Sequence, residues 1–146
     1  MRQTGFNLIE LTVTILILGI LAVVVLPRFF DRRDFDTLKF YDQCLAAVRY
    51  AQKVAVAQHA DVFVLVGPTS LAACFDAGCA TPVTDPSNGN ALSIDAPSGM
   101  TLSASSANFS FDALGRSSEP GAVTVTVAGS PSRSFTVEPE TGYVHP

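Results

Sequence analysis

The sequence predicts an α+β protein, in which a long amino-terminal helix packs on a carboxy-terminal antiparallel β-sheet domain. Three observations support this fold class. An apolar run extends from Phe6 to Leu26, an amphipathic helical pattern extends from Phe35 to about Ala60, and short segments of alternating apolar and small polar residues follow. About 120 residues lie beyond the apolar run, which is enough for one hydrophobic core.

The apolar run has the length of a transmembrane helix. At about 1.5 Å of rise per residue it spans roughly 30 Å, which matches the hydrocarbon thickness of a bilayer. Glu10 lies inside this run. A carboxylate at the centre of such a helix costs about 2.5 to 3.5 kcal/mol, and less near the interface, so we expect Glu10 to have a cationic partner.

A cut between Gly5 and Phe6 would create that partner. The new α-amine of Phe6 would lie one helical turn from Glu10, on the same face of the helix. The positive end of the helix macrodipole also favours a carboxylate at this position. The spacing is consistent with a pair within one subunit and with a pair between two subunits.

The amino terminus resembles the signal of a known family. Met1-Arg-Gln-Thr-Gly5 followed by Phe6-Asn-Leu-Ile-Glu10-Leu is similar to the cleavage and methylation signal of type IV prepilins and type II secretion pseudopilins. Gly19 and Pro27 lie where the helix of that family carries a glycine and a proline, so we expect the helix to kink there.

This resemblance implies a maturation pathway and a set of partners. A prepilin peptidase would remove the leader, residues 1–5, and methylate the amine of Phe6. An inner-membrane assembly platform and other pilin subunits would then build a helical filament, in which Glu10 pairs with the amine of a neighbouring subunit. Asn7 departs from the family, which more often has threonine or a similar small residue there, but we expect processing to proceed.

The alternatives are an ordinary membrane anchor and an uncleaved signal peptide. An anchor has no need of Glu10, and no small-residue cleavage site follows Leu26. Lysine and arginine are more numerous after the apolar run than before it, a count that alone places the carboxyl side in the cytoplasm. Acidic residues interleave with those cations and the cysteines favour export, so we expect a single-pass inner-membrane protein with a periplasmic carboxy-terminal domain.

The expected organisation is a leader at 1–5, a transmembrane and filament-core helix at 6–27, an amphipathic helix at 28–60 and a β-domain at 61–146. The two helices would form one long helix kinked at Pro27. The apolar stripe of the second helix is interrupted by Gln52. The residues expected to pack on the sheet are Leu38, Tyr41, Leu45, Val48 and Val56, whereas Asp42, Arg49 and Lys53 share another face.

Strands are predicted where apolar and polar residues alternate between turn signals. They are residues 61–66, 71–75, 100–103, 109–111, 123–127, 135–137 and 143–144. Turn chemistry at 67–70 and 138–142 predicts two hairpins. Residues 80–99 are expected to form a long loop that is too polar for a core element. Its acidic and amide residues, Asp85, Asn88, Asn90 and Asp95, are expected in a solvated turn, because their spacing does not match an EF-hand calcium loop.

Three cysteines indicate an oxidising compartment. Cys74 and Cys79 enclose a short loop containing Gly78, so we expect a local disulfide that closes a small hairpin. Cys44 then remains as a small apolar residue on the helix, and its pairing with Cys74 or Cys79 is the alternative. No second close ligand pair exists to complete a zinc site with His59 or His145, so we expect no metal, and both histidines are expected to be solvent-exposed.

No catalytic constellation or cofactor motif is present, and we predict a protein that is not an enzyme. The net charge of −4 disfavours nucleic acid as a partner, and the later half of the chain offers only Arg116 and Arg133 for phosphate contacts. Residues 109–116 and 141–144 resemble the minor pilins related to pseudopilin H. Residues 26–29 and 49–53 resemble minor pilins of the mannose-sensitive haemagglutinin pilus.

We therefore predict a minor pilin, a structural subunit of a type IV pilus. The alternative is a minor pseudopilin of a type II secretion system. A DNA-binding minor pilin that acts in DNA uptake is a lesser alternative.

Overall fold

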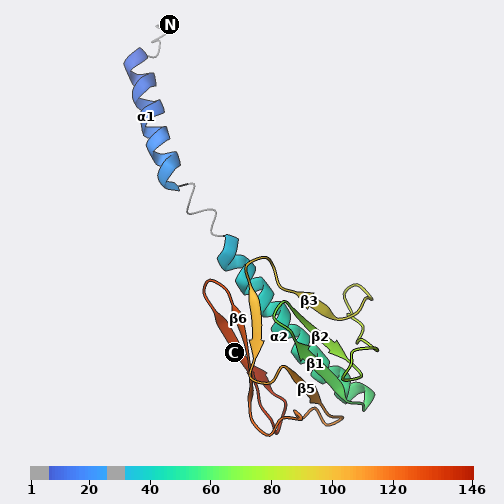
Figure 1. Cartoon of the computed structure of the whole chain (residues 1–146). Helices are drawn as coiled ribbons and strands as arrows, with labels where there is room; N and C mark the ends of the chain where they lie inside the picture. Colours follow the sequence, from blue (N-terminus) through green and yellow to red (C-terminus); the bar gives the residue numbers. More distant parts are fainter. Residues whose placement is uncertain (1–6, 26–31) are drawn as a thin grey trace. The chain divides into compact units, whose positions relative to one another are not determined.

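The computed structural model describes residues 7–25 and 32–146 (Figure 1). The chain divides into two compact units, Met1–Arg32 and Arg33–Pro146, which are described separately. Helix α1 (Leu8–Val25) belongs to the first unit, and all but the first residue of α2 (Arg32–Gln58) belongs to the second. Pro27 lies outside the described residues, so the kink at Pro27 and the joining of the two helices stay predictions.

Helix α2 ends in a left-handed residue that closes its last turn. His59 has a φ of 50°, and the amide of Ala60 donates to the carbonyl of Ala55 at 3.2 Å. This bond belongs to the Schellman type of helix end, in which a left-handed residue lets the chain turn back over the last carbonyls. The chain then enters the first strand at Val62.

The buried face of α2 is rotated from the predicted stripe. Tyr41, Leu45 and Val48 are buried as expected, but Leu38 and Val56 are 39% and 42% exposed. The least exposed residues of α2 include Val48 of the predicted stripe and five residues outside it: Phe40, Cys44, Ala47, Ala51 and Ala55. Small side chains at the centre let the helix lie close to the strands, and the larger Leu38 and Val56 are left at its flanks.

Eight strands lie within residues 32–146: β1 (Val62–Val66), β2 (Ser70–Cys74), β3 (Ser93–Asp95), β4 (Thr101–Ala104), β5 (Asn108–Phe111), β6 (Val123–Ala128), β7 (Arg133–Val137) and β8 (Val144–His145). The predicted strands all appear, with ends shifted by one or two residues. The two predicted hairpins are also confirmed, because β1 pairs with β2 and β7 pairs with β8, both antiparallel.

The strands form two four-stranded antiparallel sheets rather than one. Their orders are β3-β2-β1-β5 and β4-β6-β7-β8. Alternate residues of β1 and β6 are buried, as expected for strands with one covered face. Both sheets and α2 contribute to one hydrophobic cluster, in which Tyr41 of α2 meets Phe135 of β7 edge to face at 5.9 Å.

The expectation that 80–99 is only a polar loop is wrong. Ser93–Asp95 forms strand β3 beside β2, and Val83 and Leu92 are 1% and 6% exposed. The carboxylate of Asp85 accepts bonds from the amide and the hydroxyl of Ser87 at 2.8 and 2.7 Å. This turn folds the segment back on itself, so that a few apolar residues reach the core despite the polar composition.

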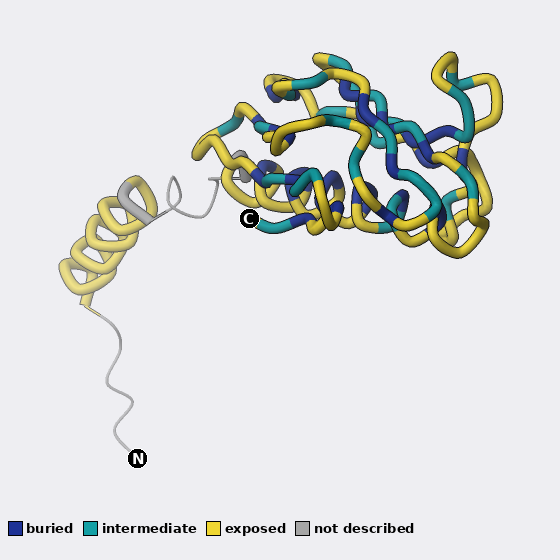
Figure 2. The backbone as a smooth tube through the Cα atoms, turned by 90° about the horizontal axis from the view of Figure 1, so that it is seen from below, coloured by how far each residue is buried: buried dark blue, intermediate teal, exposed yellow. Residues whose placement is uncertain are grey.

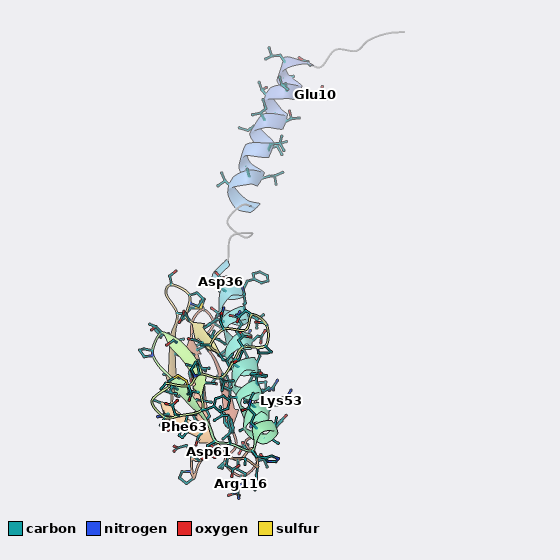
Figure 3. All side chains as sticks on the ribbon, turned by 90° about the vertical axis from the view of Figure 1, so that its right-hand side faces the viewer. Glu10, Asp36, Lys53, Asp61, Phe63 and Arg116 are labelled. Carbon is teal, nitrogen blue, oxygen red and sulfur yellow. A yellow bond between two sulfur atoms is a disulfide. The ribbon has the colours of Figure 1, made fainter. Side chains whose placement is uncertain are left out.

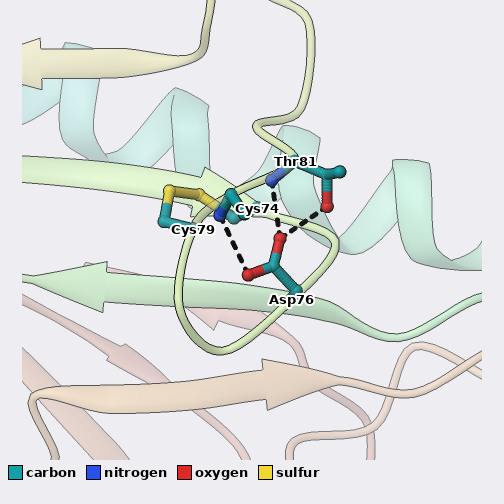
Figure 4. Close-up of a disulfide and its surroundings, with 5 residues drawn as sticks. Cys74, Asp76, Cys79 and Thr81 are labelled. Atoms are coloured by element: carbon teal, nitrogen blue, oxygen red, sulfur yellow. Dashed lines mark hydrogen bonds between the residues drawn. A yellow bond between two sulfur atoms is a disulfide. The ribbon is translucent and has the colours of Figure 1, made fainter.

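The disulfide between Cys74 and Cys79 is present, with Cα atoms 5.1 Å apart. Asp76 lies inside the loop that it closes, and its two oxygens accept bonds from the amides of Ala80 and Thr81 at 2.9 and 2.6 Å (Figure 4). The Thr81 hydroxyl donates to the same carboxylate. These hydrogen bonds lower the pKa of Asp76 to about 2, and the bond from the Thr81 hydroxyl has the largest effect.

Replacement of Asp76 by asparagine is expected to loosen this loop while leaving the disulfide intact. The stabilisation by the ionised carboxylate is present above the ordinary aspartate pKa and is lost as the pH falls through about 2. Amide hydrogen exchange at Ala80 and Thr81 measures the effect: protection should fall in Asp76→Asn at pH 5, and in the wild type between about pH 4 and pH 2. Asp95→Asn is the matched control, and an equal loss of protection in it would contradict the prediction.

Candidate functional site

Helix α1 begins with a side-chain cap. The Asn7 carboxamide oxygen accepts from the amide of Ile9 at 3.4 Å, and the Asn7 carbonyl accepts from the amides of Glu10 and Leu11 at 2.9 and 3.2 Å. Asparagine and threonine both serve as N-caps, so Asn7 can cap the helix as the threonine that is more common at this position would. Thr12 and Thr14 donate to carbonyls three residues earlier, so their hydroxyls are paired within the helix.

Helix α1 is apolar on every side, and its residues 8–23 are exposed in the single chain (Figure 2). The exposed fraction ranges from 47% at Val13 to 77% at Leu8 among its large apolar residues. A helix that is hydrophobic all round requires apolar surroundings. Among the helices of 7–25 and 32–146, none combines the length and hydropathy that a bilayer crossing requires.

Glu10 is the single charged residue of α1 and lies in its first turn (Figure 3). Within the described part of the chain, its carboxylate has no hydrogen bond or ion pair. Its exposed position in the first turn leaves it accessible to a cation from outside the helix. Gly5 and Phe6 lie outside the described residues, so their cleavage and methylation stay predictions. Gly19 lies inside α1, which continues through it.

A second group of residues joins α2 to two distant loops. The Gln52 side-chain amide donates to the carbonyls of Gly115 and Thr141, both at 2.9 Å. We name Gln52, Gly115, Thr141 and Gly142 the junction. Gln52 interrupts the apolar stripe because its amide pairs with these two carbonyls, a role that sequence analysis missed. The signal was a polar amide inside an apolar stripe, but its partners are 63 and 89 residues away.

Two glycines of the junction are required by geometry. Gly142 has a φ of 60°, and a Cβ there would lie 1.9 Å from the Gly115 carbonyl oxygen. Gly115 has a φ of 81°, and a Cβ there would lie 3.0 Å from Val56. These positions account for the glycines in both segments, 109–116 and 141–144, that resemble minor pilins.

One turn before Gln52 on α2, Arg49 makes a similar contact. Its Nε and Nη2 donate to the carbonyl oxygen of Val144 at 3.1 and 2.8 Å. Arg49 was predicted on the polar face, and it is exposed, yet it holds β8 against the helix. The helix therefore fixes the last strand through a charge-assisted bond.

The remaining candidate residues have structural roles. Arg116 forms an ion pair with Asp112 at 2.9 Å, and the pKa of Asp112 is lowered chiefly by a bond from the Arg116 amide. Arg133 lies over the Tyr41 ring, 6.0 Å from its centroid. Cys44 has a free and fully buried thiol. Burial raises the pKa of this thiol to about 12. The prediction of an unpaired small residue on the helix is therefore confirmed for Cys44.

The two histidines differ from each other. His59 is exposed, as predicted. His145 is half-buried, and its Nε2 lies 3.0 Å from a carboxylate oxygen of Glu138, so the expected solvent exposure is only partly confirmed for this residue. The bond to Glu138 raises the pKa of His145. The turn at 138–142 brings these two side chains together across the β7–β8 hairpin.

Solved structures with this fold include two pilin-like proteins. The minor pilin FimU of Pseudomonas aeruginosa is 15% identical, with a TM-score of 0.58 over 80% of this chain and 90% of that chain. The minor pseudopilin EpsH of Vibrio cholerae is 12% identical, with a TM-score of 0.54 over 77% of this chain and 94% of that chain. At these identities the likeness confirms the predicted α+β pilin-like fold alone.

Sequence comparisons identify the family. The type IV narrow pilus major component PilA5 of Thermus thermophilus is 45% identical over 58 residues, which are 40% of this chain and 50% of that protein. The chain thus matches half the length of this relative. The family model of the type II transport protein GspH matches residues 42–141, which is more than half of the chain and includes Gln52, Gly115 and Thr141 of the junction. The chain therefore belongs to the GspH family and is a member of the type IV pilin and pseudopilin proteins.

Proposed function

We propose that this chain is a minor pilin of a type IV pilus of the mannose-sensitive haemagglutinin type. After removal of the leader between Gly5 and Phe6, it crosses the inner membrane once, with residues 33–146 in the periplasm. The inner-membrane platform then inserts it into a filament, where α1 enters the core and residues 33–146 lie at the surface or tip. The same insertion step would allow it to initiate assembly.

One observation carries this proposal: α1 exposes apolar side chains on all sides and has one carboxylate in its first turn. Packing such helices together in a filament covers their apolar surfaces. Glu10 then has a partner in the methylated amine of Phe6 from a neighbouring subunit. Members of this family associate with a pilus or pseudopilus, where they contact other pilin subunits.

A minor pseudopilin of a type II secretion system is the second candidate. It is favoured by the match of residues 42–141 to the type II transport protein GspH. The assignment to the haemagglutinin-type pilus depends on residues 26–29 and 49–53. Deletion of the gene in the native host separates the candidates, because a pilin deletion reduces surface filaments whereas a pseudopilin deletion reduces protein secretion.

The proposal is tested by mass spectrometry of filaments sheared from the native host. We expect this chain among the minor components, with a methylated Phe6 as its first residue. Recovery of the chain only in the membrane fraction with residues 1–5 attached would contradict the proposal.

Replacement of Gly5 by leucine is expected to leave the leader attached. The peptidase requires a small residue beside the bond that it cuts, so the variant should accumulate in the membrane and be at least about tenfold depleted from filaments. The intact mass of the purified variant checks this outcome. Gln3→Leu is the control, since it changes the leader away from the cleavage site, and a mature Phe6 terminus in Gly5→Leu would exclude the predicted cleavage requirement.

A further inference from the structure

The edge strands of the two sheets differ in whether their outward N–H and C=O groups are hydrogen-bonded. In an antiparallel pair, residues alternate between those bonded to the partner strand and those whose N–H and C=O point away from it. At an edge strand, the latter groups are free unless another segment meets them. The four edge strands here are β3 and β5 in one sheet and β4 and β8 in the other.

Three of these edges are met by other parts of the chain. On β5, the outward N–H and C=O of Ser110 bond to the hydroxyl and the amide of Ser118 at 3.0 and 2.8 Å. On β4, the outward amide of Leu102 donates to the Pro68 carbonyl at 2.9 Å. On β8, the outward carbonyl of Val144 accepts from Arg49 at 2.8 Å.

The edge of β3 is open. The amide of Ala96 donates to the Thr69 carbonyl, and the carbonyl of Leu92 accepts from the Ala73 amide. Since residues bonded to the partner strand alternate with residues that are not, Ile94, between these two, is the residue of β3 that bonds to Leu71 of β2. The N–H and C=O groups of Ser93 and Asp95 therefore point outward. The Ser93 amide makes a local bond to Ala91, and no described residue bonds to the Ser93 carbonyl or to either backbone group of Asp95.

This open edge borders a groove of about 560 Å³. One wall is the flank of α2 at Gln43, Ala46 and Tyr50, and the other walls are β3 and the turn at 85–88. Asp85 and Asp95 are among the lining residues, and no lysine or arginine is. The pKa of Asp85 is lowered chiefly by the hydrogen bond from the Ser87 amide, and further by the bond from the Ser87 hydroxyl. The groove therefore retains negative charge over a wide pH range.

From these observations we propose that β3 is a strand-addition site for an extended segment of a partner protein that carries basic residues. The added strand pairs with the three free groups of Ser93 and Asp95 and continues the sheet over the flank of α2. Its inward side chains are apolar and lie on Ala46, Tyr50 and Ile94. Its outward side chains are basic and lie beside Asp95.

A second copy of this chain is a poor occupant. Pairing β3 with its own copy would bring together the Asp95 and Asp85 carboxylates of both copies, and like charges opposite each other destabilise a sheet. The proposal goes beyond filament assembly by α1, and it stands or fails independently of Glu10 and Phe6.

Peptide binding to the full-length chain in detergent tests the site. The probe is a blocked peptide of sequence Thr-Lys-Val-Lys-Val-Lys-Thr, and the control peptide has glutamate in place of lysine. Two further versions carry N-methyl groups, either on the lysine amides or on the valine amides. Because alternate amides point to opposite edges of a strand, one methylated version should bind about tenfold more weakly and the other should bind normally.

Protein variants test the edge itself. Asp95→Pro removes the outward N–H without removing a bond to β2, and it should weaken binding of the lysine peptide by about tenfold. Asp95→Asn keeps the N–H and should weaken binding by about two- to fivefold. Asn108→Pro removes an outward N–H from the β5 edge and should have no effect. Protection of the Ile94 amide from exchange confirms that each variant is folded.

The expected pattern is binding that requires the lysines, one face of peptide amides and the Asp95 N–H. Equal binding of the glutamate peptide, equal binding of both methylated versions, or unchanged binding to Asp95→Pro would each overturn the proposal. Absence of binding by the lysine peptide at roughly 1 mM would also overturn it.

Discussion

Replacement of Gly142 by alanine is expected to lower the free energy of unfolding by about 3 to 5 kcal/mol. The left-handed φ of 60° disfavours alanine, and the new Cβ would lie 1.9 Å from the Gly115 carbonyl oxygen and 2.6 Å from the Gln52 amide nitrogen. Relief of this overlap separates Gly142 from Gly115 and breaks the bonds that Gln52 makes. Chemical denaturation of the full-length chain in detergent measures the loss.

Two glycine controls separate the causes. Gly89 has a φ of 75°, and a Cβ there would have no atom within 4 Å, so Gly89→Ala should cost only about 1 kcal/mol, for the backbone conformation. Gly121 is open and has no left-handed φ, so Gly121→Ala should be nearly neutral. A Gly142→Ala variant no less stable than Gly89→Ala would show that close packing at the junction contributes nothing.

Replacement of Glu10 by valine is expected to leave membrane insertion intact but to reduce recovery in sheared filaments at least about tenfold. Valine removes the cost of placing a carboxylate in an apolar environment, so insertion is no worse. The variant also loses the group that would pair with the methylated amine of Phe6 in a neighbouring subunit, and that amine is left without a counter-charge. Quantitative immunoblotting of membrane and filament fractions measures both effects.

Matched substitutions identify the cause of this loss. Glu10→Gln keeps the size and removes the charge, and it should behave as Glu10→Val does. Thr12→Val removes a polar group whose hydroxyl is already bonded to the Ile9 carbonyl, and it should assemble normally. Wild-type recovery of either Glu10 variant in filaments would remove the basis of the proposed pairing, although the fold and family membership would be unaffected.

Secondary structure was predictable because its signals are local. The alternation in β1 and β6 and the turn residues at 67–70 and 138–142 depend on neighbours a few positions away. The disulfide between Cys74 and Cys79 was predictable for the same reason, since five positions separate its ends. The buried face of α2 was not predictable in this way, because Leu38 and Val56 are as apolar as the residues that are buried.

The residues of the candidate site also differ in whether the sequence alone identifies them. Glu10 was identified from sequence, because a carboxylate within an apolar run is anomalous whatever the surrounding fold. The junction was not identified from sequence, since Gln52, Gly115 and Gly142 become neighbours only when the loop after β5 and the β7–β8 turn come back to the helix. The open edge of β3 lay in a segment predicted to be a loop.

Local signals were thus sufficient to predict the two helices, every strand except β3 and the short disulfide. The resemblance of the amino-terminal motif indicated membership of the pilin and pseudopilin proteins. The division of the strands into two sheets, the choice of which helix face is buried, and the strand edge left uncovered required the folded chain. The physical reason is that these features arise from contacts between residues tens of positions apart. Many pairings satisfy the same hydrophobic pattern, and packing and backbone hydrogen bonding select one of them.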